Sequence, residues 1–553
     1  MIANSGWLVG LLVISSCATC FSHSHPHIIL IVVDDLGWND ISLHGSPQIP
    51  TPNIDALAAD GVVLNNYYVS PICSPSRGAL MTGMYPIHTG LQHYVIVAGE
   101  PWGLPLHFNT MPQHFQCLGY TTHAIGKWHL GFFRKEYTPT FRGFDSHFGY
   151  WTGREDFYDH TAFTGAGWGL DFHDNLTTVS DALGKYATNI FTEKAIKIIE
   201  QNQNTKPLFL MLAHLAVHAG NPYAPLQAPK YYIDRFKNIK NKKRRKFAGM
   251  VAALDDSIGL VVEALYKASM LNNSIIVVTS DNGGAAGGID DSAASNWPLR
   301  GTKYTMWEGG IRGSALLWSP LLEKGGGRVA PQMMHISDWL PTLYHAAGGL
   351  VSDLGELDGV QLWDALSKNL PSQRTEILHN IDPIWKVAAL RVGDFKLVQG
   401  TVFHGKYDKW FGPSGRTSTK NKFRAHNKTS EDIQKLRNMC LNSVTAKTLK
   451  EIGRSLSAEF CSLPEAIQVN CGTKPTNASR NCQPNKNPCV YNIKEDPCEY
   501  NNLAQIHPEI TNSLSQRLQE YNKTAVAPGN KPADPFAVPL FHDFTWVNWM
   551  DKH

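Results

Sequence analysis

Four short apolar segments of this chain each end close to charged or amide side chains, and this pattern constrains the fold more than any other feature. The segments comprise residues 28–33, 121–125, 208–212 and 275–278. Their length and β-branched content suit strands that are buried on both faces. The stretches between them, at 51–60, 181–200 and 247–270, are typical of helices. This alternation predicts an α/β sandwich built on a mostly parallel sheet.

Polar residues follow each of the four predicted strands. In chain order they are Asp34 and Asp35, Lys127 and His129, His218, and Asp281 and Asn282. In an open parallel sheet, ligands bind outside the carboxyl ends of the strands. We therefore expect these residues to meet at one edge of the sheet.

The residues after the first and fourth strands suggest a metal site. Asp34, Asp35, Asp281 and Asn282 offer only hard oxygen ligands, which suit calcium or magnesium better than a soft metal. A single acidic pair is often a helix cap or a turn. Two such pairs, each at the end of a predicted strand, favour the metal site.

Length and charge limit the class of protein. At 553 residues the chain exceeds one ordinary domain, which predicts a large unit followed by a smaller one. The smaller unit is expected from residue 379 onward, with a hairpin at 387–398. Residues 401–486 are rich in Lys, Asn and Ser, and they are interpreted as a loop-rich insertion without assigned secondary structure. A net charge of +3 with 18% charged residues argues against a nucleic-acid partner.

The N-terminal residues indicate a secreted chain. Residues 1–22 hold an apolar run followed by small residues, as a signal peptide does. The alternative, a membrane anchor, needs about 20 apolar residues, and this run is shorter. No later segment is long and apolar enough to span a bilayer, so no span is expected in the mature chain. Sequons for N-glycosylation occur at Asn175, Asn272, Asn427, Asn477 and Asn522.

Cysteine usage agrees with an oxidising compartment. The late cysteines predict a disulfide-stapled region, and they are Cys440, Cys461, Cys471, Cys482, Cys489 and Cys498. Cys489 and Cys498 flank a short strand-like stretch and are a plausible pair, whereas the others cannot be paired from the sequence. Cys117 is interpreted as a buried helix residue.

The segment from Cys73 to Gly78, Cys-Ser-Pro-Ser-Arg-Gly, resembles the signature of the type I sulfatases. Matching motifs extend over nearly the whole chain, at residues 34–38, 126–131, 217–218, 280–284 and 303–310. Together they resemble the branch of arylsulfatase B, or N-acetylgalactosamine-4-sulfatase, and of many insect arylsulfatases. The resemblance implies an alkaline-phosphatase-like sandwich over residues 23–378. It also implies a C-terminal subdomain at 379–553, with a small antiparallel sheet and a helix, and residues 507–522 fit that helix.

The resemblance further implies a sulfuric ester hydrolase in which Cys73 is oxidised to formylglycine by the formylglycine-generating enzyme. The family signature usually continues to a Leu-Thr-Gly-Arg or Met-Thr-Gly-Arg stretch that assists recognition by that enzyme, and here Met84 replaces its arginine. In the hydrated aldehyde, one hydroxyl attacks the sulfate ester, and deprotonation of the other expels inorganic sulfate. A predicted helix at 76–83 would present its N-terminal amides to the anion.

Family motifs also assign roles around residue 73. One calcium ion is expected on Asp34, Asp35, Asp281 and Asn282, together with residue 73. Lys127 and Lys303 are expected on the sulfate oxygens and Arg77 on the formylglycine. His129 would contact the second hydroxyl, and His218 the bridging oxygen of the leaving group.

Alternatives remain at the level of function. A degenerate sulfatase fold could bind sulfated glycans without cleaving them, and an unmodified Cys73 would favour that interpretation. Related phosphatases need Asp and His ligands for two zinc ions, and no such set is evident. Candidate substrates are aryl sulfates, glycosaminoglycans and sulfated plant glucosides such as glucosinolates, in a secreted or lysosomal enzyme. Loops 94–104 and 149–168 are expected to set specificity.

A basic run at 237–246 precedes the helix predicted at 247–270. It is either a solvated lead-in to that helix or a contact for a polyanion.

Overall fold

The computed structural model describes residues 25–202, 206–412, 430–462 and 465–551. The predicted signal peptide therefore lies outside the described residues. Within them, a ten-stranded sheet has the order β13-β2-β12-β11-β1-β10-β4-β5-β8-β9. Its parallel centre consists of β11 (Ser274–Ser280), β1 (His27–Val33), β10 (Leu208–His214), β4 (Thr121–Lys127) and β5 (Ser146–Tyr150). The α/β architecture predicted from the alternating segments is confirmed.

Shorter strands extend this centre on both sides. On one side lie β12 (Ala315–Trp318), β2 (Val62–Leu64) and β13 (Arg328–Ala330), and on the other β8 (His173–Asp174) and β9 (Thr177–Thr178). β12 and β8 each pair antiparallel with the edge of the parallel centre. Two small pairs stand apart from this sheet, β3 (Tyr67–Tyr68) with β14 (Met334–His335) and β6 (Thr161–Thr164) with β7 (Gly167–Leu170).

Strand β1 shows why the sheet is covered on both faces. All of its residues are buried. Alternate residues beginning with Ile29 join one apolar core, with side chains of α1 (Pro52–Asp60), α5 (Ala187–Asn202) and α7 (Lys242–Lys267). Those beginning with Ile28 join the other core, with α2 (Cys73–Thr82), α4 (Met111–Cys117) and α9 (Trp339–Ala346). Because successive strand residues face opposite sides, the sheet that contains β1 is the middle layer of a sandwich, with helices on both faces.

Helices α5 and α7 start away from their predicted bounds. Helix α5 starts at Ala187 instead of residue 181. Helix α7 starts at Lys242, so the second half of the basic run belongs to its first turns. The Asn241 side chain caps this end by accepting a hydrogen bond from the Arg244 backbone N–H at 3.0 Å. The other α-helices described before residue 379 are α3 (Pro86–Thr89), α6 (Lys230–Asp234), α8 (Glu308–Ile311) and α10 (Trp363–Lys368).

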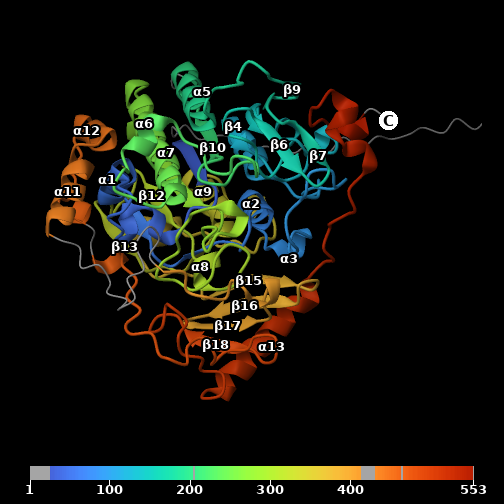
Figure 1. The fold of residues 1–553 in the computed structure, drawn as a ribbon. Coiled ribbons are helices and arrows are strands. Elements are labelled where there is room, and N and C mark those ends of the chain that lie inside the picture. The colour runs from blue at the N-terminus through green and yellow to red at the C-terminus, as the bar shows by residue number, and fades with distance from the viewer. Residues whose placement is uncertain (1–24, 203–205, 413–429, 463–464, 552–553) are drawn as a thin grey trace, which may run out of the picture.

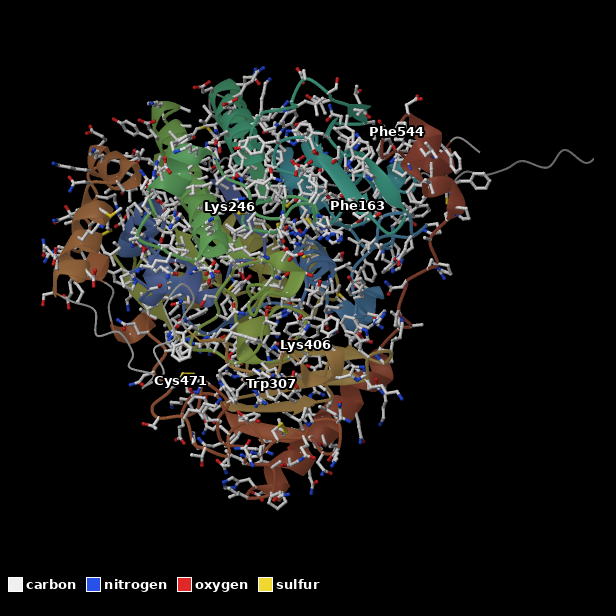
Figure 2. The ribbon with its side chains drawn as sticks, in the orientation of Figure 1. Phe163, Lys246, Trp307, Lys406, Cys471 and Phe544 are labelled. Carbon is white, nitrogen blue, oxygen red and sulfur yellow. A yellow bond between two sulfur atoms is a disulfide. The ribbon has the colours of Figure 1, made fainter. Side chains whose placement is uncertain are left out.

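A smaller antiparallel sheet forms the end of the molecule opposite α5 and α6 (Figure 1). It consists of β15 (Glu376–Asp382), β16 (Val387–Val392), β17 (Phe395–Gln399) and β18 (Cys489–Asn492), backed by α13 (Pro508–Thr524). Strand β15 crosses the boundary expected between residues 378 and 379. Trp307 of the large unit reaches this sheet (Figure 2), where its ring centroid lies 5.9 Å from that of Tyr491.

The insertion at 401–486 contains helices that the sequence did not reveal. They are α11 (Ser430–Leu441) and α12 (Val444–Glu451), and both contact α1 of the large unit. Only Leu436 and Cys440 of α11 are buried, and two of the four buried residues of α12 are threonines, so the apolar pattern of both helices is weak. The insertion is therefore partly helical and folds back on the main sandwich.

Disulfides join the late cysteines, as predicted, but the proposed Cys489 to Cys498 pair is wrong. The bonds are Cys440 to Cys461, Cys471 to Cys498 and Cys482 to Cys489. Strand β18 starts at Cys489 and runs extended, so it carries the chain away before Cys498 is reached. Cys117 was expected to be buried, yet it is exposed as the last residue of α4.

None of the helices in the described residues has the length and apolar character needed to cross a membrane.

Candidate active site

The ends of adjacent strands bring the predicted polar residues together. Strand β1 lies between β10 and β11, and the residues after their last positions stay joined by backbone hydrogen bonds. Asp34 N donates to Ala216 O at 3.1 Å, and Asp281 N donates to Val33 O at 3.2 Å. The sheet therefore fixes the backbone from which these side chains project.

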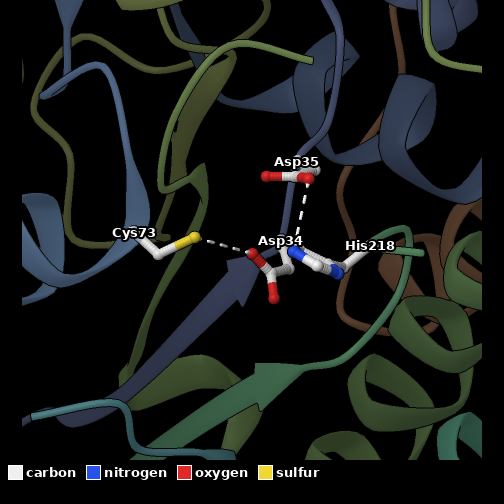
Figure 3. A group of neighbouring side chains, drawn as sticks. All are labelled: Asp34, Asp35, Cys73 and His218. Atoms are coloured by element: carbon white, nitrogen blue, oxygen red, sulfur yellow. Dashed lines mark hydrogen bonds and ion pairs between the residues drawn. The ribbon is translucent and has the colours of Figure 1, made fainter. Parts of the chain in front are cut away.

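Asp34, Asp35, Cys73 and His218 form a buried cluster in which potential metal ligands lie within 4.8 Å of one another (Figure 3). The Cys73 thiol donates to Asp34 Oδ1 at 3.7 Å, and His218 Nε2 lies 3.6 Å from Asp35 Oδ2. The presence of His218 among these atoms was not expected, since the sequence assigned it to the leaving group only.

The other two predicted metal ligands adjoin this cluster. Asn282 Nδ2 donates to Asp35 Oδ1 at 2.7 Å, and Asp281 Oδ1 accepts from Asp35 N at 3.3 Å. Asn282 Oδ1 is buried without a hydrogen-bond partner among the described residues. An unpaired buried oxygen beside three carboxylates fits a hard cation, because such an ion would satisfy that oxygen and offset the crowded negative charge.

Each carboxylate also has a cationic partner. Lys127 Nζ lies 2.7 Å from Asp34 Oδ2, Arg77 Nη2 lies 3.0 Å from Asp281 Oδ2, and Lys303 Nζ lies 2.8 Å from Asp35 Oδ2. All six side chains are buried. Three buried cations therefore lie directly beside the three carboxylates.

Burial and neighbouring charges separate the pKa values of the carboxyl groups. Burial and the adjacent Asp281 raise the pKa of Asp34 to about 7. Burial also opposes ionisation of Asp35, but the charge and hydrogen bond of Lys303 act against it, and the pKa of Asp35 is lowered. For Asp281, Arg77 and Lys127 outweigh burial in the same way and lower its pKa. The raised pKa of Asp34 means that Lys127 and Arg77 do not fully offset its burial and the repulsion from Asp281. A bound cation would supply further positive charge there.

Cys73 is the first residue of α2, and Gly83 ends this helix in a left-handed conformation with φ +70°. Arg77 lies one turn later, on the same face as Cys73. Its Nε donates to Asp281 Oδ2 at 3.1 Å and its Nη1 to the Lys127 carbonyl at 3.1 Å. Burial raises the pKa of the Cys73 thiol, so the unmodified side chain is a protonated and weak nucleophile.

The two histidines are neutral and hold fixed orientations. Burial, Lys127 and Arg77 lower the pKa of His129, whose Nε2 lies 3.1 Å from Ile96 O. Burial and Lys303 lower the pKa of His218 to about 3. His218 Nδ1 donates to Ala219 O at 2.6 Å, which leaves Nε2 to accept from Lys303 Nζ at 3.1 Å. In this structure Nε2 of His218 therefore carries no proton and faces the Lys303 ammonium.

Cys73, His129, His218 and Lys303 open into a pocket of about 260 Å³. Both loops expected to set specificity line it, through residues 94–98 and through 153–154 with 163–165. The sequence did not single out Asp290, which lies 3.3 Å from Lys303 Nζ, or Tyr304, which follows Lys303. The only sequence signal for Asp290 is its place in an acidic pair after the motif at 280–284. A larger cavity of about 500 Å³, lined by Asn65 and Arg391, contains none of the predicted site residues.

Fold and site together define an enzyme of the alkaline-phosphatase-like class, with a buried oxygen-rich cluster beside a cationic anion pocket. Residues 26–349 match the model of the Sulfatase family, and the chain belongs to that family. It is therefore a sulfuric ester hydrolase.

Named relatives agree with this membership. The chain is 39% identical to arylsulfatase J of Mus musculus over 549 residues, covering 96% of this chain and 81% of the relative. It is 32% identical to N-acetylgalactosamine-6-sulfatase of Homo sapiens over 359 residues, covering 62% of this chain and 66% of that enzyme. The solved structure of Ps i-CgsB in complex with k-i-k-neocarrahexaose has a TM-score of 0.68 at 26% identity, covering 92% of this chain and 94% of that one.

Proposed function

We propose that this enzyme hydrolyses sulfate monoesters through a formylglycine made from Cys73, with one bound calcium ion. The observation that carries the proposal is the position of residue 73. It lies at the start of α2, buried beside three carboxylates and their three cationic partners. A protonated thiol has little use at such a place, whereas a hydrated formylglycine supplies one hydroxyl to attack sulfur and a second to release the sulfate.

The chain's own residues would bind the ion and the substrate. Asp34, Asp35, Asp281 and Asn282, with residue 73, would hold calcium, which offsets the negative charge of the sulfate. The unpartnered Asn282 Oδ1 and the raised pKa of Asp34 support this assignment. His218 belongs to the same cluster, but its Nε2 already accepts from Lys303, so we assign it to the substrate instead.

Cations would bind and orient the sulfate. Lys127 and Lys303 are assigned to its oxygens, and Arg77 to the side chain of residue 73. Fixed cations in a buried site stabilise charge that develops in the transition state, because they need no reorientation and little water screens them. His129, with Nδ1 unpartnered among the described residues, is assigned to the second hydroxyl of residue 73.

We assign the proton for the leaving group to His218, which lines the pocket. Its Nδ1 donates to Ala219 O, and its Nε2 lies 3.1 Å from Lys303 Nζ. A proton carried on Nε2 would pass to the bridging oxygen of the ester as its bond to sulfur breaks, whereas the Lys303 ammonium keeps its proton and stays with the sulfate oxygens.

The branch and substrate belong to the same proposal. We place the chain near arylsulfatase B and insect arylsulfatases, with a sulfated glycan or aryl sulfate as substrate. The names of its relatives, which include an N-acetylgalactosamine-6-sulfatase, support a sulfated sugar.

We further propose a secreted or lysosomal enzyme, modified by the formylglycine-generating enzyme in the secretory pathway. Its disulfides support an oxidising compartment. The sequon residues Asn175, Asn272, Asn477 and Asn522 are exposed, so glycans could be attached to them. Asn427 lies outside the described residues.

The test is release of inorganic sulfate from 4-methylumbelliferyl sulfate by protein secreted from cells that contain the modifying enzyme. Wild-type protein should release sulfate, chelation of calcium should reduce the rate, and Cys73→Ala should abolish turnover. Binding of sulfated glycans without any sulfate release would instead favour the degenerate, glycan-binding alternative.

A further inference from the structure

Arg154 is a half-buried cation in the wall of the active-site pocket. Every other cation near the cluster has a carboxylate partner. Lys303, for example, lies 2.8 Å from Asp35 and 3.3 Å from Asp290. In the described part of the chain, the Arg154 guanidinium has neither an ion pair nor a hydrogen bond. It is therefore available to an anionic group of a ligand.

The backbone around Arg154 is fixed against the catalytic residues. A Cβ atom on Gly153 would lie 2.7 Å from Nε2 of His129, so this glycine allows the loop to touch the imidazole. Thr152 N donates to Asp171 Oδ2 at 2.8 Å, and Thr152 Oγ1 donates to the Arg154 carbonyl at 3.0 Å. On the other side, Glu155 is fully buried. The position of Arg154 beside the reacting groups is thus determined, while its side chain stays available.

An aromatic wall stands in the same pocket. Tyr94 stacks on Tyr304, with ring centroids 6.1 Å apart and planes 13° apart. Trp385 meets both rings edge-on, at 5.6 Å and 6.4 Å. Asp382 fixes Trp385 by accepting from its backbone N–H at 3.0 Å. Phe163, which also lines the pocket, lies on the β6–β7 hairpin and is 46% exposed (Figure 2).

Flat aromatic rings and an available guanidinium favour different parts of one ligand. The rings suit the C–H face of a sugar or another ring, and the planar guanidinium suits a carboxylate or sulfate bound in a bidentate manner. The pocket volume of about 260 Å³ is smaller than the roughly 300–1,000 Å³ of pockets that enclose drug-sized ligands. One sugar ring with its substituents therefore enters, and the rest of a chain remains outside.

We infer that Arg154 binds a second anionic group of the substrate, so that the preferred substrate is a sulfated sugar unit that also carries a carboxylate or a second sulfate. The ring lies against Tyr94 and Tyr304, the sulfate to be cleaved lies over residue 73, and the second anion contacts Arg154. This inference rests on the proposed sulfatase function and specifies its substrate class.

The test compares Arg154→Gln with wild type on matched ligands. Binding is measured by calorimetry in the Cys73→Ala background, with mono- and disulfated hexosamines and with sulfated disaccharides with and without a uronic acid. We expect the tightest ligand to be dianionic. Arg154→Gln should weaken that ligand by about 10- to 100-fold, the range of one charged hydrogen bond, and its monoanionic counterpart much less. Arg154→Lys should restore part of the loss, and the exposed Arg480→Gln should cause none.

Turnover separates this inference from the function on which it rests. With residue 73 intact, Arg154→Gln should raise KM for the dianionic substrate more than it lowers kcat. If both ligand classes lose affinity equally, or if wild type prefers monoanionic ligands, the assignment of Arg154 is wrong even when sulfate is released. If Arg154 discriminates between the ligands but no sulfate is released from any substrate, the sulfatase proposal fails and the binding inference stands.

Discussion

His218 and Lys303 contact each other at 3.1 Å, yet we assign them to different parts of the substrate. Lys303 meets sulfate oxygens, which all substrates share. His218 meets the bridging oxygen, which needs a proton in proportion to the basicity of the leaving group. The same pocket floor therefore contains one residue that acts on every substrate and one whose importance depends on the alcohol released.

Replacing His218 by Ala should distinguish these roles. We expect kcat to fall by about 10-fold or less on an activated aryl sulfate and by roughly 10²–10⁴-fold on a carbohydrate sulfate, because only the sugar alkoxide needs the proton. Lys303→Ala should reduce kcat/KM on both substrates alike. His345→Ala, at a surface position of α9, is the control. Equal losses on both substrates for His218→Ala would show that it binds sulfate or only packs against Asp35.

Among the elements, α7 carries a charge pattern that opposes its own dipole. Lys242 and Lys243 are exposed in its first turn, where the helix N-terminus is already partially positive. Lys243 is partly compensated by Asp291, at 3.4 Å. Lys243 therefore lies beside Asp291, which is adjacent to Asp290 of the pocket.

Lys242→Glu should therefore stabilise the fold. Placing a negative charge at the first position of α7 should increase the free energy of unfolding by about 0.3–1 kcal/mol, seen as a higher Tm. The opposite effect is expected at the other end of this helix. Lys267→Glu, at its last residue, should lower Tm, because it places a negative charge at the helix C-terminus and removes the ion pair with Glu263. A lower Tm for Lys242→Glu would mean that the lysine makes a stabilising contact that outweighs the dipole.

Periodicity and strand ends were sufficient to predict the central parallel strands other than β5 and the meeting of Asp34, Lys127, His218 and Asp281. The pattern worked there because buried parallel strands are continuous apolar runs. Edge strands such as β8 and β9 have only two residues each, too few to show alternation. Helix α11 buries only two residues, and α12 buries threonines as well as apolar residues, so neither shows a clear apolar face in the sequence.

Contacts between distant segments set the features that the sequence could not show. The Cys471 to Cys498 bond depends on the path of the chain after strand β18, and the spacing of the cysteines does not reveal that path. The same holds for the availability of Arg154, since it follows from the absence of a carboxylate opposite its guanidinium in the described residues. The motifs name candidate residues for the chemistry, whereas tertiary contacts decide which side chains remain accessible to substrate.

At the scale of the whole molecule, a buried charge cluster joins the two units. Lys396 of β17 lies 2.9 Å from Glu308 of α8 and 2.7 Å from Glu499, and all three side chains are fully buried. The loop that carries Lys303 leads directly into α8, and its Gly301 N–H donates to the Lys409 carbonyl at 2.8 Å. The C-terminal unit therefore helps to position an active-site cation.

Lys396→Met should disrupt the whole molecule rather than the C-terminal sheet alone. It leaves two buried carboxylates without their cation, a loss of about 3–5 kcal/mol in the free energy of unfolding. Tm and sulfatase activity should fall together. Lys494→Met, at an exposed position, should stay within about 0.5 kcal/mol of wild type. Full activity in Lys396→Met would show that the large unit positions Lys303 without help from the small sheet.

The central claim is that residue 73 acts as formylglycine, and mass spectrometry of the peptide that contains it tests this claim most directly. Wild-type protein from secreting cells should yield the mass of the aldehyde or its hydrate at residue 73. Specific activity should rise in proportion to the fraction of residue 73 that is modified, when preparations with different degrees of conversion are compared. Fully active protein that contains only the Cys73 thiol would contradict the account.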